Sequence, residues 1–414
     1  MNKKTKIIFI TSEICVCVVF GMILPAIMSF NFAFDVDYIE NGEYTGNYLV
    51  TDGGGKIVIV DRKGQLLWKT ELAEVFVHDA DILPDGNIMI GDLANDRVIV
   101  VNISDPDEII WEWDARNIDD IDWEAFGVAQ GWNEEGIAYI TDQNPPHKYW
   151  THLNDADWIN KTQYGFYNDT ILVSLRNFDL IVEVNYSDTK EIVWWYGEPC
   201  NHEYLYKQHN PDRLPNNNTI ICDSENHKII EINYTTKQIE WEFELEFPNG
   251  QLRWARDCDD MGDGRYLITD STNARLLIID RETKQIEKII HSPLLFQVYD
   301  ADYTNGKIIA GEYLSGIVLI DPESGWTTGL IGFPTYIVCL IYILAFLTGY
   351  YYYRCIDEYR NVKKKGFLQK FRDYRVYHYF IYGTVILTTL VILPSCMGFF
   401  WHYGIQVIVD YFIN

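Results

Sequence analysis

Residues 78–113 read HDADILPDGNIMIGDLANDRVIVVNISDPDEIIWEW, and this stretch decides the fold. It holds an Asp-x-Asp pair, a Gly/Asn turn, two short apolar segments and a final segment that contains Trp. Short segments of alternating or fully apolar character between Gly, Asn and Asp turns are typical of β-strands. The stretch therefore predicts one compact unit of about four strands.

The same sequence pattern recurs along the middle of the chain. Further copies begin at Asn154-Asp155-Ala156-Asp157, His209-Asn210-Pro211-Asp212, Arg256-Asp257-Cys258-Asp259 and Tyr299-Asp300-Ala301-Asp302, and a worn first copy begins at Phe34-Asp35-Val36-Asp37. Four-stranded units with a period in the forties predict propeller blades. The expected fold class is all-β, with a six-bladed β-propeller over residues 35–325. The sixth copy stops after Ile317 to Asp321, so we expect a strand from the start of the domain to pair with its edge.

Charge and composition exclude some classes of protein. The 414 residues include 60 acidic and 33 basic side chains, a formal charge of −27, which disfavours a nucleic-acid binder. With 48% hydrophobic and 22% charged residues the chain has the composition of a globular protein. All of the acidic excess lies between two apolar ends, which themselves hold more basic than acidic residues.

Those ends predict membrane segments. Residues 1–34 carry three lysines before a long apolar run, and we expect an uncleaved anchor, with a cleaved signal peptide as the alternative. Residues 326–414 hold two further apolar runs, 329–353 and 376–400, around a basic loop at about 354–375. The positive-inside rule places the N-terminus and this loop in the cytoplasm. The expected localisation is a multi-pass cell-membrane protein with the propeller outside the cytoplasm and the lipid bilayer as a partner.

Asparagine sequons support the outer placement of the middle region. Six Asn-X-Ser/Thr sites lie there, at Asn102, Asn160, Asn168, Asn185, Asn217 and Asn233. All fall in predicted turns on the face opposite the start of the innermost strands, although Asn-rich turns also produce sequons by chance. Only Cys200, Cys222 and Cys258 lie in this region, so at most one disulfide is expected within it.

The repeat also predicts which residues meet at one end of the axial channel. The position before each Asp-x-Asp pair begins the innermost strand, and it is occupied by His78, Asn154, His209, Arg256 and Tyr299. His152 lies two residues before Asn154 and would point the same way on an extended strand. Arg176 follows the second strand of the third copy, in a loop on the same face.

Three other features have a structural and a functional interpretation. The Asp-x-Asp pairs are possible calcium ligands, but their repetition favours short acceptors that tie neighbouring segments together. The Trp residues of the outer strands are expected to pack between blades rather than to form a ligand cage. The aromatic insertion between Trp113 and His152 is expected either to wall a site for an aromatic compound or to plug the channel.

Four motifs in this order resemble the PAPS-independent arylsulfate sulfotransferases, which are six-bladed propellers exported from the cytoplasm. They are Trp150-Thr151-His152-Leu153-Asn154-Asp155, Ser174-Leu175-Arg176-Asn177, Glu191-Ile192-Val193-Trp194 with Gly197, and Gln208-His209. The flanking apolar segments and the long turn at Ile159 to Asp169 depart from the family pattern.

The resemblance implies a mechanism and a site. His209 matches the nucleophile that becomes transiently sulfated, while His78, His152 and Arg176 match the positions that hold the sulfuryl group. Asn154, Arg256 and Tyr299 are then expected to bind substrate. The implied substrates are an aryl sulfate and a phenol, with no cofactor and no metal; no oligomeric state is predicted. The alternatives are a non-catalytic extracytoplasmic binding or scaffold propeller, and a metal-dependent lyase or lactonase with His78 and His209 as ligands.

Overall fold

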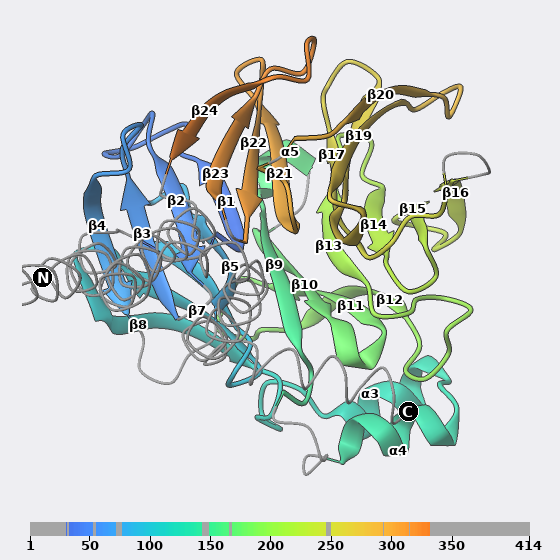
Figure 1. Cartoon of the computed structure of the whole chain (residues 1–414). Helices are drawn as coiled ribbons and strands as arrows, with labels where there is room; N and C mark the ends of the chain where they lie inside the picture. The colour runs from blue at the N-terminus through green and yellow to red at the C-terminus, as the bar shows by residue number, and fades with distance from the viewer. Residues whose placement is uncertain are drawn as a thin grey trace, which may run out of the picture. The chain divides into compact units, whose positions relative to one another are not determined.

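Six antiparallel sheets of four strands each make up the described part of the chain, and Figure 1 shows them in sequence order from blue to orange. The chain divides into two compact units, and the described residues belong to the unit Met28–Pro334. The computed structural model describes residues 30, 33–52, 55–71, 77–142, 149–164, 168–245, 250–292, 294–313 and 315–331. The sequence prediction of an all-β, six-bladed propeller is therefore confirmed.

The first three blades follow the first three copies of the repeat. Blade one comprises β1 (Asp35–Tyr38), β2 (Tyr48–Asp52), β3 (Lys56–Val60) and β4 (Leu66–Glu71). Blade two comprises β5 (Val77–Ile82), β6 (Ile88–Asp92), β7 (Arg97–Asn102) and β8 (Asp105–Asp114). Blade three comprises β9 (Leu153–Ile159), β10 (Thr170–Leu175), β11 (Leu180–Asn185) and β12 (Ile192–Gly197).

The other three blades follow in the same way. Blade four comprises β13 (His209–Arg213), β14 (Thr219–Asp223), β15 (Lys228–Ile232) and β16 (Ile239–Glu244). Blade five comprises β17 (Ala255–Asp260), β18 (Arg265–Asp270), β19 (Arg275–Asp280) and β20 (Ile286–Ile290). Blade six comprises β21 (Val298–Thr304), β22 (Lys307–Glu312), β23 (Gly316–Ile320) and β24 (Thr327–Ile331).

In the described part of the chain, helices occupy only the connections between strands. Helices α3 (Trp123–Gln130) and α4 (Glu134–Thr141) lie between blades two and three, and α5 (Lys161–Tyr164) lies between β9 and β10. Single 3₁₀ turns, η2 (Arg176–Phe178) and η3 (Ser271–Asn273), follow the second strands of blades three and five.

The burial of each strand follows its place in the blade. The second strands β2, β6, β10 and β14 are buried along their whole length, because neighbouring blades cover both faces. These strands are accordingly continuous apolar runs, as expected for strands covered on both sides. The fourth strands are largely exposed or alternate, as in β16, where Trp241 and Phe243 are buried between exposed glutamates.

The ring closes without a strand exchanged between its ends. The first strands touch their neighbours around the axis, and β1 contacts β21 and β22 of the last blade. Blade six has its own fourth strand, β24, paired with β23. The expectation that a strand from the start of the domain completes blade six is therefore wrong. Residues 327–331 were missed because they run into the apolar stretch that predicts a membrane segment.

The Asp-x-Asp pairs join neighbouring first strands through hydrogen bonds. The first carboxylate of a pair accepts the backbone N–H between the two aspartates of the next blade, as Asp79 does from Ala156 at 2.8 Å. The same bond joins Ala80 to Asp35, Ala301 to Asp257, and Val36 to Asp300, the last of which links blade one to blade six. The interpretation of these residues as structural acceptors is confirmed at these positions.

The Trp residues of the outer strands make a second ring of inter-blade bonds. The indole N–H of one Trp in each of the first four blades donates to a carbonyl in a turn of the following blade, at 2.7–3.1 Å. The pairs are Trp68 with Ile103, Trp111 with Ser187, Trp194 with Tyr234 and Trp241 with Arg281. The packing role expected for these Trp residues is confirmed.

Most of the predicted membrane segments lie outside the described residues. Residues 1–29 and 332–414 are among these, while Phe30, Ala33 and Phe34 are buried in the propeller. Within the described part of the chain, no helix has both the length and the apolar character needed to cross a membrane. Cys200, Cys222 and Cys258 are free thiols.

Candidate functional site

The blade repeat places the predicted residues at one end of the axial channel. His209 is the first residue of β13, and His78, Asn154, Arg256 and Tyr299 are the second residues of their first strands. The first strands all run the same way along the axis, so these five residues occupy one level. His152 directly precedes β9, and Arg176 opens η2 in a loop on the same face.

Ring and guanidinium contacts show that the residues meet. The imidazole centroids of His78 and His152 are 6.2 Å apart, and the ring of Tyr299 is 6.0 Å from that of His78. The Arg256 guanidinium lies 3.8 Å from the centroid of the Tyr299 ring. The structure therefore gathers the imidazoles and arginines that were expected at the channel mouth.

Asn154 has a supporting place in this group. Its side-chain N–H donates to the backbone carbonyl of Gln208 at 2.9 Å, and Gln208 immediately precedes His209. Gln208 in turn donates to the carbonyl of Leu180 and to the hydroxyl of Ser174. Asn154 thus helps to fix the start of β13 across the boundary between blades three and four.

The conformation of His152 differs from the one assumed in the sequence argument. His152 has φ 49°, in the left-handed region, and is not part of the extended strand. Lys207 and Trp254, which also lie two residues before the shared position, have φ 51° and 56°. A left-handed residue with a side chain is uncommon and costs energy, so its recurrence before three first strands indicates a fixed turn at the mouth.

The hydrogen bonds of His209 define its tautomer. The Ser224 hydroxyl directs its single hydrogen at the carbonyl of Ala255, at 2.6 Å, or of Cys222, at 3.2 Å. The Ser224 oxygen must therefore accept the bond from Nδ1 of His209, at 2.8 Å. On the other side of the ring, the indole N–H of Trp254 donates to Nε2 at 3.3 Å. Both contacts require a neutral imidazole with its proton on Nδ1 and its lone pair on Nε2.

Burial and positive neighbours keep all three imidazoles neutral. Burial, followed by the charges of Arg256 and Arg176, lowers the pKa of His78 to about 3 and holds the pKa of His209 well below its usual range. Burial and Arg176 lower the pKa of His152 in the same direction. The site therefore combines permanent positive charge on two arginines with uncharged imidazoles.

An aromatic stack borders the imidazoles. Phe34 lies parallel to Tyr299, with ring centroids 4.4 Å apart and an interplanar angle of 3°, and Tyr313 lies 5.7 Å from both. Phe34 occupies, in the first copy of the repeat, the position that His78 occupies in the second. The first copy of the repeat, Phe34-Asp35-Val36-Asp37, is less regular than the others. Its alignment with the second copy would have placed Phe34 in the predicted site.

Trp254 and Ser224 were also missed by the sequence argument. Trp254 lies beneath Arg176, at 5.5 Å, and Arg256, at 5.6 Å, besides its bond to His209. The position of Trp254 two residues before Arg256 matches that of His152 before Asn154, which was a usable signal. Ser224 lies in a short loop and carries no motif that would have identified it.

The inserted segment mainly extends the hydrophobic core. Trp123, Trp132 and Trp150 are buried in a cluster with blades two and three, and Trp123 and Trp150 meet the ring of Phe178 edge to face. Tyr149 is closer to the site, with its ring centroid 6.1 Å from that of His152. The middle of the insertion, residues 143–148, lies outside the described residues. Most of the expected aromatic wall is therefore core.

The described residues contain one group of three side chains spaced to hold a metal ion: Asp212, Asp257 and Asp259. His78 and His209, the ligands expected for a metal-dependent lyase, are not part of it.

The sequon asparagines lie away from this site. Asn102 and Asn185 end the third strands of their blades and Asn233 follows one, while Asn160, Asn168 and Asn217 are in turns between first and second strands. Both the ends of the third strands and the turns after the first strands lie at the end of the blades opposite the start of the first strands. Glycosylation itself stays a prediction.

Comparison with known proteins bears on the family. The family model described as arylsulfotransferase (ASST) matches residues 39–210. The matched range includes His78, His152, Arg176 and His209 and stops before Arg256 and Tyr299. The resemblance drawn from the four motifs is thus confirmed. No protein of curated function matches the chain.

Solved structures with similar folds are distant in sequence. A protein of unknown function from Bacteroides caccae is 13% identical, with a TM-score of 0.45, over 70% of this chain and 94% of that one. Virginiamycin B lyase from Staphylococcus aureus is 13% identical, with a TM-score of 0.44, over 72% and 87%. The WD40 β-propeller domain of Doa1 is 12% identical, with a TM-score of 0.43, over 68% and 77%.

Proposed function

We propose that this chain, whose residues 39–210 match the arylsulfotransferase family, transfers sulfate from an aryl sulfate ester to a phenolic acceptor through a sulfated His209. The observation that carries the proposal is the state of His209. The His209 ring lies close to two arginines and two further imidazoles, with its proton held on Nδ1 by Ser224. Its Nε2 lone pair accepts the Trp254 N–H at 3.3 Å, a bond that must be given up when Nε2 attacks the donor ester. A neutral imidazole in this state is a competent nucleophile.

In the first displacement, Nε2 of His209 attacks the sulfur of the donor ester. The N–S bond forms as the bond from sulfur to the aryl oxygen breaks, and the leaving oxygen takes the electron pair as a phenolate. The imidazole keeps its proton on Nδ1 and becomes positively charged. The Ser224 oxygen, which accepts that proton's hydrogen bond, stabilises the charge.

In the second displacement, the acceptor phenol attacks the same sulfur. The new S–O bond forms as the N–S bond breaks, the acceptor proton passes to solvent, and neutral His209 is restored. The sulfuryl group moves intact in both steps, so neither a nucleotide nor a redox partner is required. Two displacements with one covalent intermediate predict ping-pong kinetics.

Fixed positive charge favours both steps. The sulfuryl oxygens stay negative throughout, and the guanidinium groups of Arg176 and Arg256 lie at the same end of the channel. Arg176 can present two N–H groups to two oxygens of one sulfuryl group. Loss of one such donor commonly slows a reaction by on the order of 100-fold or more.

The neutral state of His78 and His152 limits their role. Since burial and the arginines lower both pKa values, neither ring carries a spare proton at neutral pH before substrate binds. They act as N–H donors to an oxygen and not as strong acids. Turnover should therefore depend steeply on the leaving phenol, and donors such as p-nitrophenyl sulfate should react fastest.

The stack of Phe34, Tyr299 and Tyr313 provides the apolar side of the site. Aromatic rings favour parallel or edge-on contact with other rings, so an aryl sulfate fits against this stack while its sulfate faces the arginines. The membrane anchors, the extracytoplasmic position and the glycans predicted from the sequence belong to the same proposal. Together they describe an enzyme that works at the outer surface of a membrane.

Purified protein with p-nitrophenyl sulfate and a phenol tests the proposal. Nitrophenolate should be released without added nucleotide, and His209→Ala should abolish release while the matched exposed change His291→Ala leaves it intact. Activity that survives in His209→Ala would exclude His209 as the nucleophile. Absence of turnover across a panel of aryl sulfates, with a folded protein, would exclude the enzyme and favour the binding or scaffold propeller.

A further inference from the structure

Among the described residues, the ring of inter-blade hydrogen bonds is interrupted at blade four, where Asn210 and Pro211 stand in place of the carboxylate acceptor and the N–H donor. In the fourth copy of the repeat, Pro211 stands between Asn210 and Asp212, the two positions that are aspartates in the other copies. Proline has no backbone N–H. Its partner in the third blade would be Asp155, by analogy with the bond from Ala156 to Asp79. In the described structure Asp155 Oδ2 has no hydrogen-bond partner, although the side chain is only 4% exposed. A buried carboxylate oxygen without a donor is costly unless a cation or a proton compensates it.

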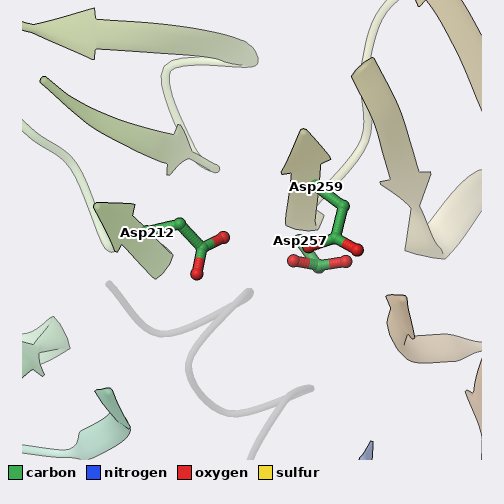
Figure 2. Close-up of side chains that lie close together, drawn as sticks. All are labelled: Asp212, Asp257 and Asp259. Atoms are coloured by element: carbon green, nitrogen blue, oxygen red, sulfur yellow. The ribbon is translucent and has the colours of Figure 1, made fainter. Parts of the chain in front are cut away.

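Three more carboxylates gather beside this gap. Figure 2 shows Asp212 on β13 and Asp257 and Asp259 on β17 with their carboxyl groups turned to the space between the strands. One oxygen from each lies within 4.8 Å of the others. Asp155 is close enough for its charge to act on Asp212, and Asp257 acts on Asp155 in the same way.

The kind of ligand indicates the kind of ion. Calcium accepts six to eight oxygen ligands in flexible geometry, whereas magnesium demands a near-ideal octahedron and usually keeps several waters. Carboxylates fixed on two strands, β13 and β17, are therefore better suited to calcium. Carboxylate oxygens are also the ligands that calcium prefers.

The surrounding strands hold these groups in place before any ion binds. Asp257 and Asp259 each accept a backbone N–H from blade six, from Ala301 at 3.2 Å and from Tyr303 at 2.8 Å. Among the described residues, none of the ion pairs within 4 Å includes Asp155 or a member of the three-carboxylate group. The negative charge in this part of the channel is therefore not offset by a paired basic side chain.

We propose that Asp212, Asp257 and Asp259, near the buried carboxylate of Asp155, bind one calcium ion in the axial channel. The ion replaces, between blades three, four and five, the hydrogen bond that Pro211 removes. It also offsets part of the negative charge that lies in the channel beyond the imidazole site. The inference does not depend on sulfate transfer, because it rests on the repeat and on the carboxylate geometry.

Calcium binding to the full-length chain tests the proposal directly. The purified protein is treated with chelator, desalted and titrated with CaCl₂ by calorimetry, with ⁴⁵Ca equilibrium dialysis to count bound ions. One ion per chain should bind, with a Kd near the range of about 10⁻⁴–10⁻³ M typical of extracellular calcium modules. Asp212→Asn should weaken binding by about tenfold or more, while the same change at exposed Asp119 should have no effect.

Thermal unfolding in chelator separates ligation from a structural role. Without calcium, Asp212→Asn removes a repelling charge, so its Tm should be no lower than that of the wild type, and added calcium should raise only the wild-type Tm. If Asp212→Asn does not fold, Asp155→Asn serves the same purpose. Absence of ⁴⁵Ca binding up to about 10 mM, above the usual range, would overturn the proposal. Equal calcium affinity in the wild type and the folded variant would overturn it as well.

Discussion

Ser224 is the residue whose change tests the chemistry of His209 most selectively. It lies in the loop after β14, is buried, and has no atom in a predicted sulfate-binding position. Its oxygen accepts the Nδ1 proton of His209 at 2.8 Å. Ser224→Ala removes that acceptor and nothing else from the imidazole.

The size of the effect follows from the burial of the pair. His209 is 2% exposed and Ser224 is 1% exposed, so water does not readily replace the lost acceptor. A buried donor left without a partner costs about 1–3 kcal/mol. At about 1.36 kcal/mol per factor of ten, this predicts a fall in kcat/KM of about 5- to 150-fold. The proton can instead move to Nε2, which removes the lone pair that attacks sulfur.

Steady-state rates with p-nitrophenyl sulfate and ¹⁵N NMR of labelled histidine provide the two readouts. The wild-type His209 should show a protonated Nδ1 and an unprotonated Nε2, and Ser224→Ala should show a mixture of tautomers. Ser224→Thr keeps a hydroxyl and should retain most of the activity. An Nε2–H tautomer in the wild type, or full activity in Ser224→Ala, would refute the assignment of the nucleophile.

Three further predictions concern pH and stability. Because the pKa of His209 is well below its usual value of about 6.5, kcat/KM should stay level as pH falls to about 5; a loss through pH 6.5 would show a normal imidazole. Burial and the charge of Asp81 raise the pKa of Asp157 to about 8, above its unfolded value of about 3.9, so its protonated form stabilises the fold, and in chelator Tm should fall as pH rises from about 4 to about 8 and level off above that; a Tm that rises over this range would contradict this. Glu183 pairs with Arg213 at 2.5 Å with both side chains fully buried, so Glu183→Gln should cost about 3–5 kcal/mol of unfolding free energy in urea. The change Asp263→Asn, in an exposed pair, should cost under about 1 kcal/mol, and equal losses would refute the distinction.

Repeated residues made most of the architecture predictable. The Asp-x-Asp pattern marks the first strand of every blade but the fourth, which has Asn210-Pro211-Asp212, because the same inter-blade bond requires a short acceptor at the same place. The fourth strand of blade six escaped prediction because it is half-exposed and runs into the apolar stretch that predicts a membrane segment. Outer strands carry little hydrophobic periodicity when one side faces solvent, so their signal is weak.

The site was predictable where it follows the repeat and hidden where it does not. His78, Asn154, His209, Arg256 and Tyr299 share one position, and their convergence followed from blade topology alone. Ser224 lies in a short loop and acts on His209 through a single hydrogen bond. No local sequence pattern indicates that contact.

One departure from the repeat, Pro211 in the fourth copy, is visible in the sequence. Pro211 stands where the other described blades have a residue with an N–H, and the consequence for Asp155 needs only the chemistry of proline. The metal site proposed here differs from the expectation of no metal because that expectation treated all the Asp-x-Asp pairs alike.

Transfer of sulfate through His209 requires a covalent intermediate on that residue. The most direct measurement is mass spectrometry of peptides from protein that is quenched during turnover of p-nitrophenyl sulfate. The quench and the digestion are alkaline, to preserve the N–S bond of a sulfated histidine. If sulfate passes through His209, the peptide containing His209 should gain the mass of one SO₃ group. The gain should disappear when a phenol acceptor is added. Turnover with an unmodified His209 peptide, or the same gain on another residue in His209→Ala, would contradict transfer through His209.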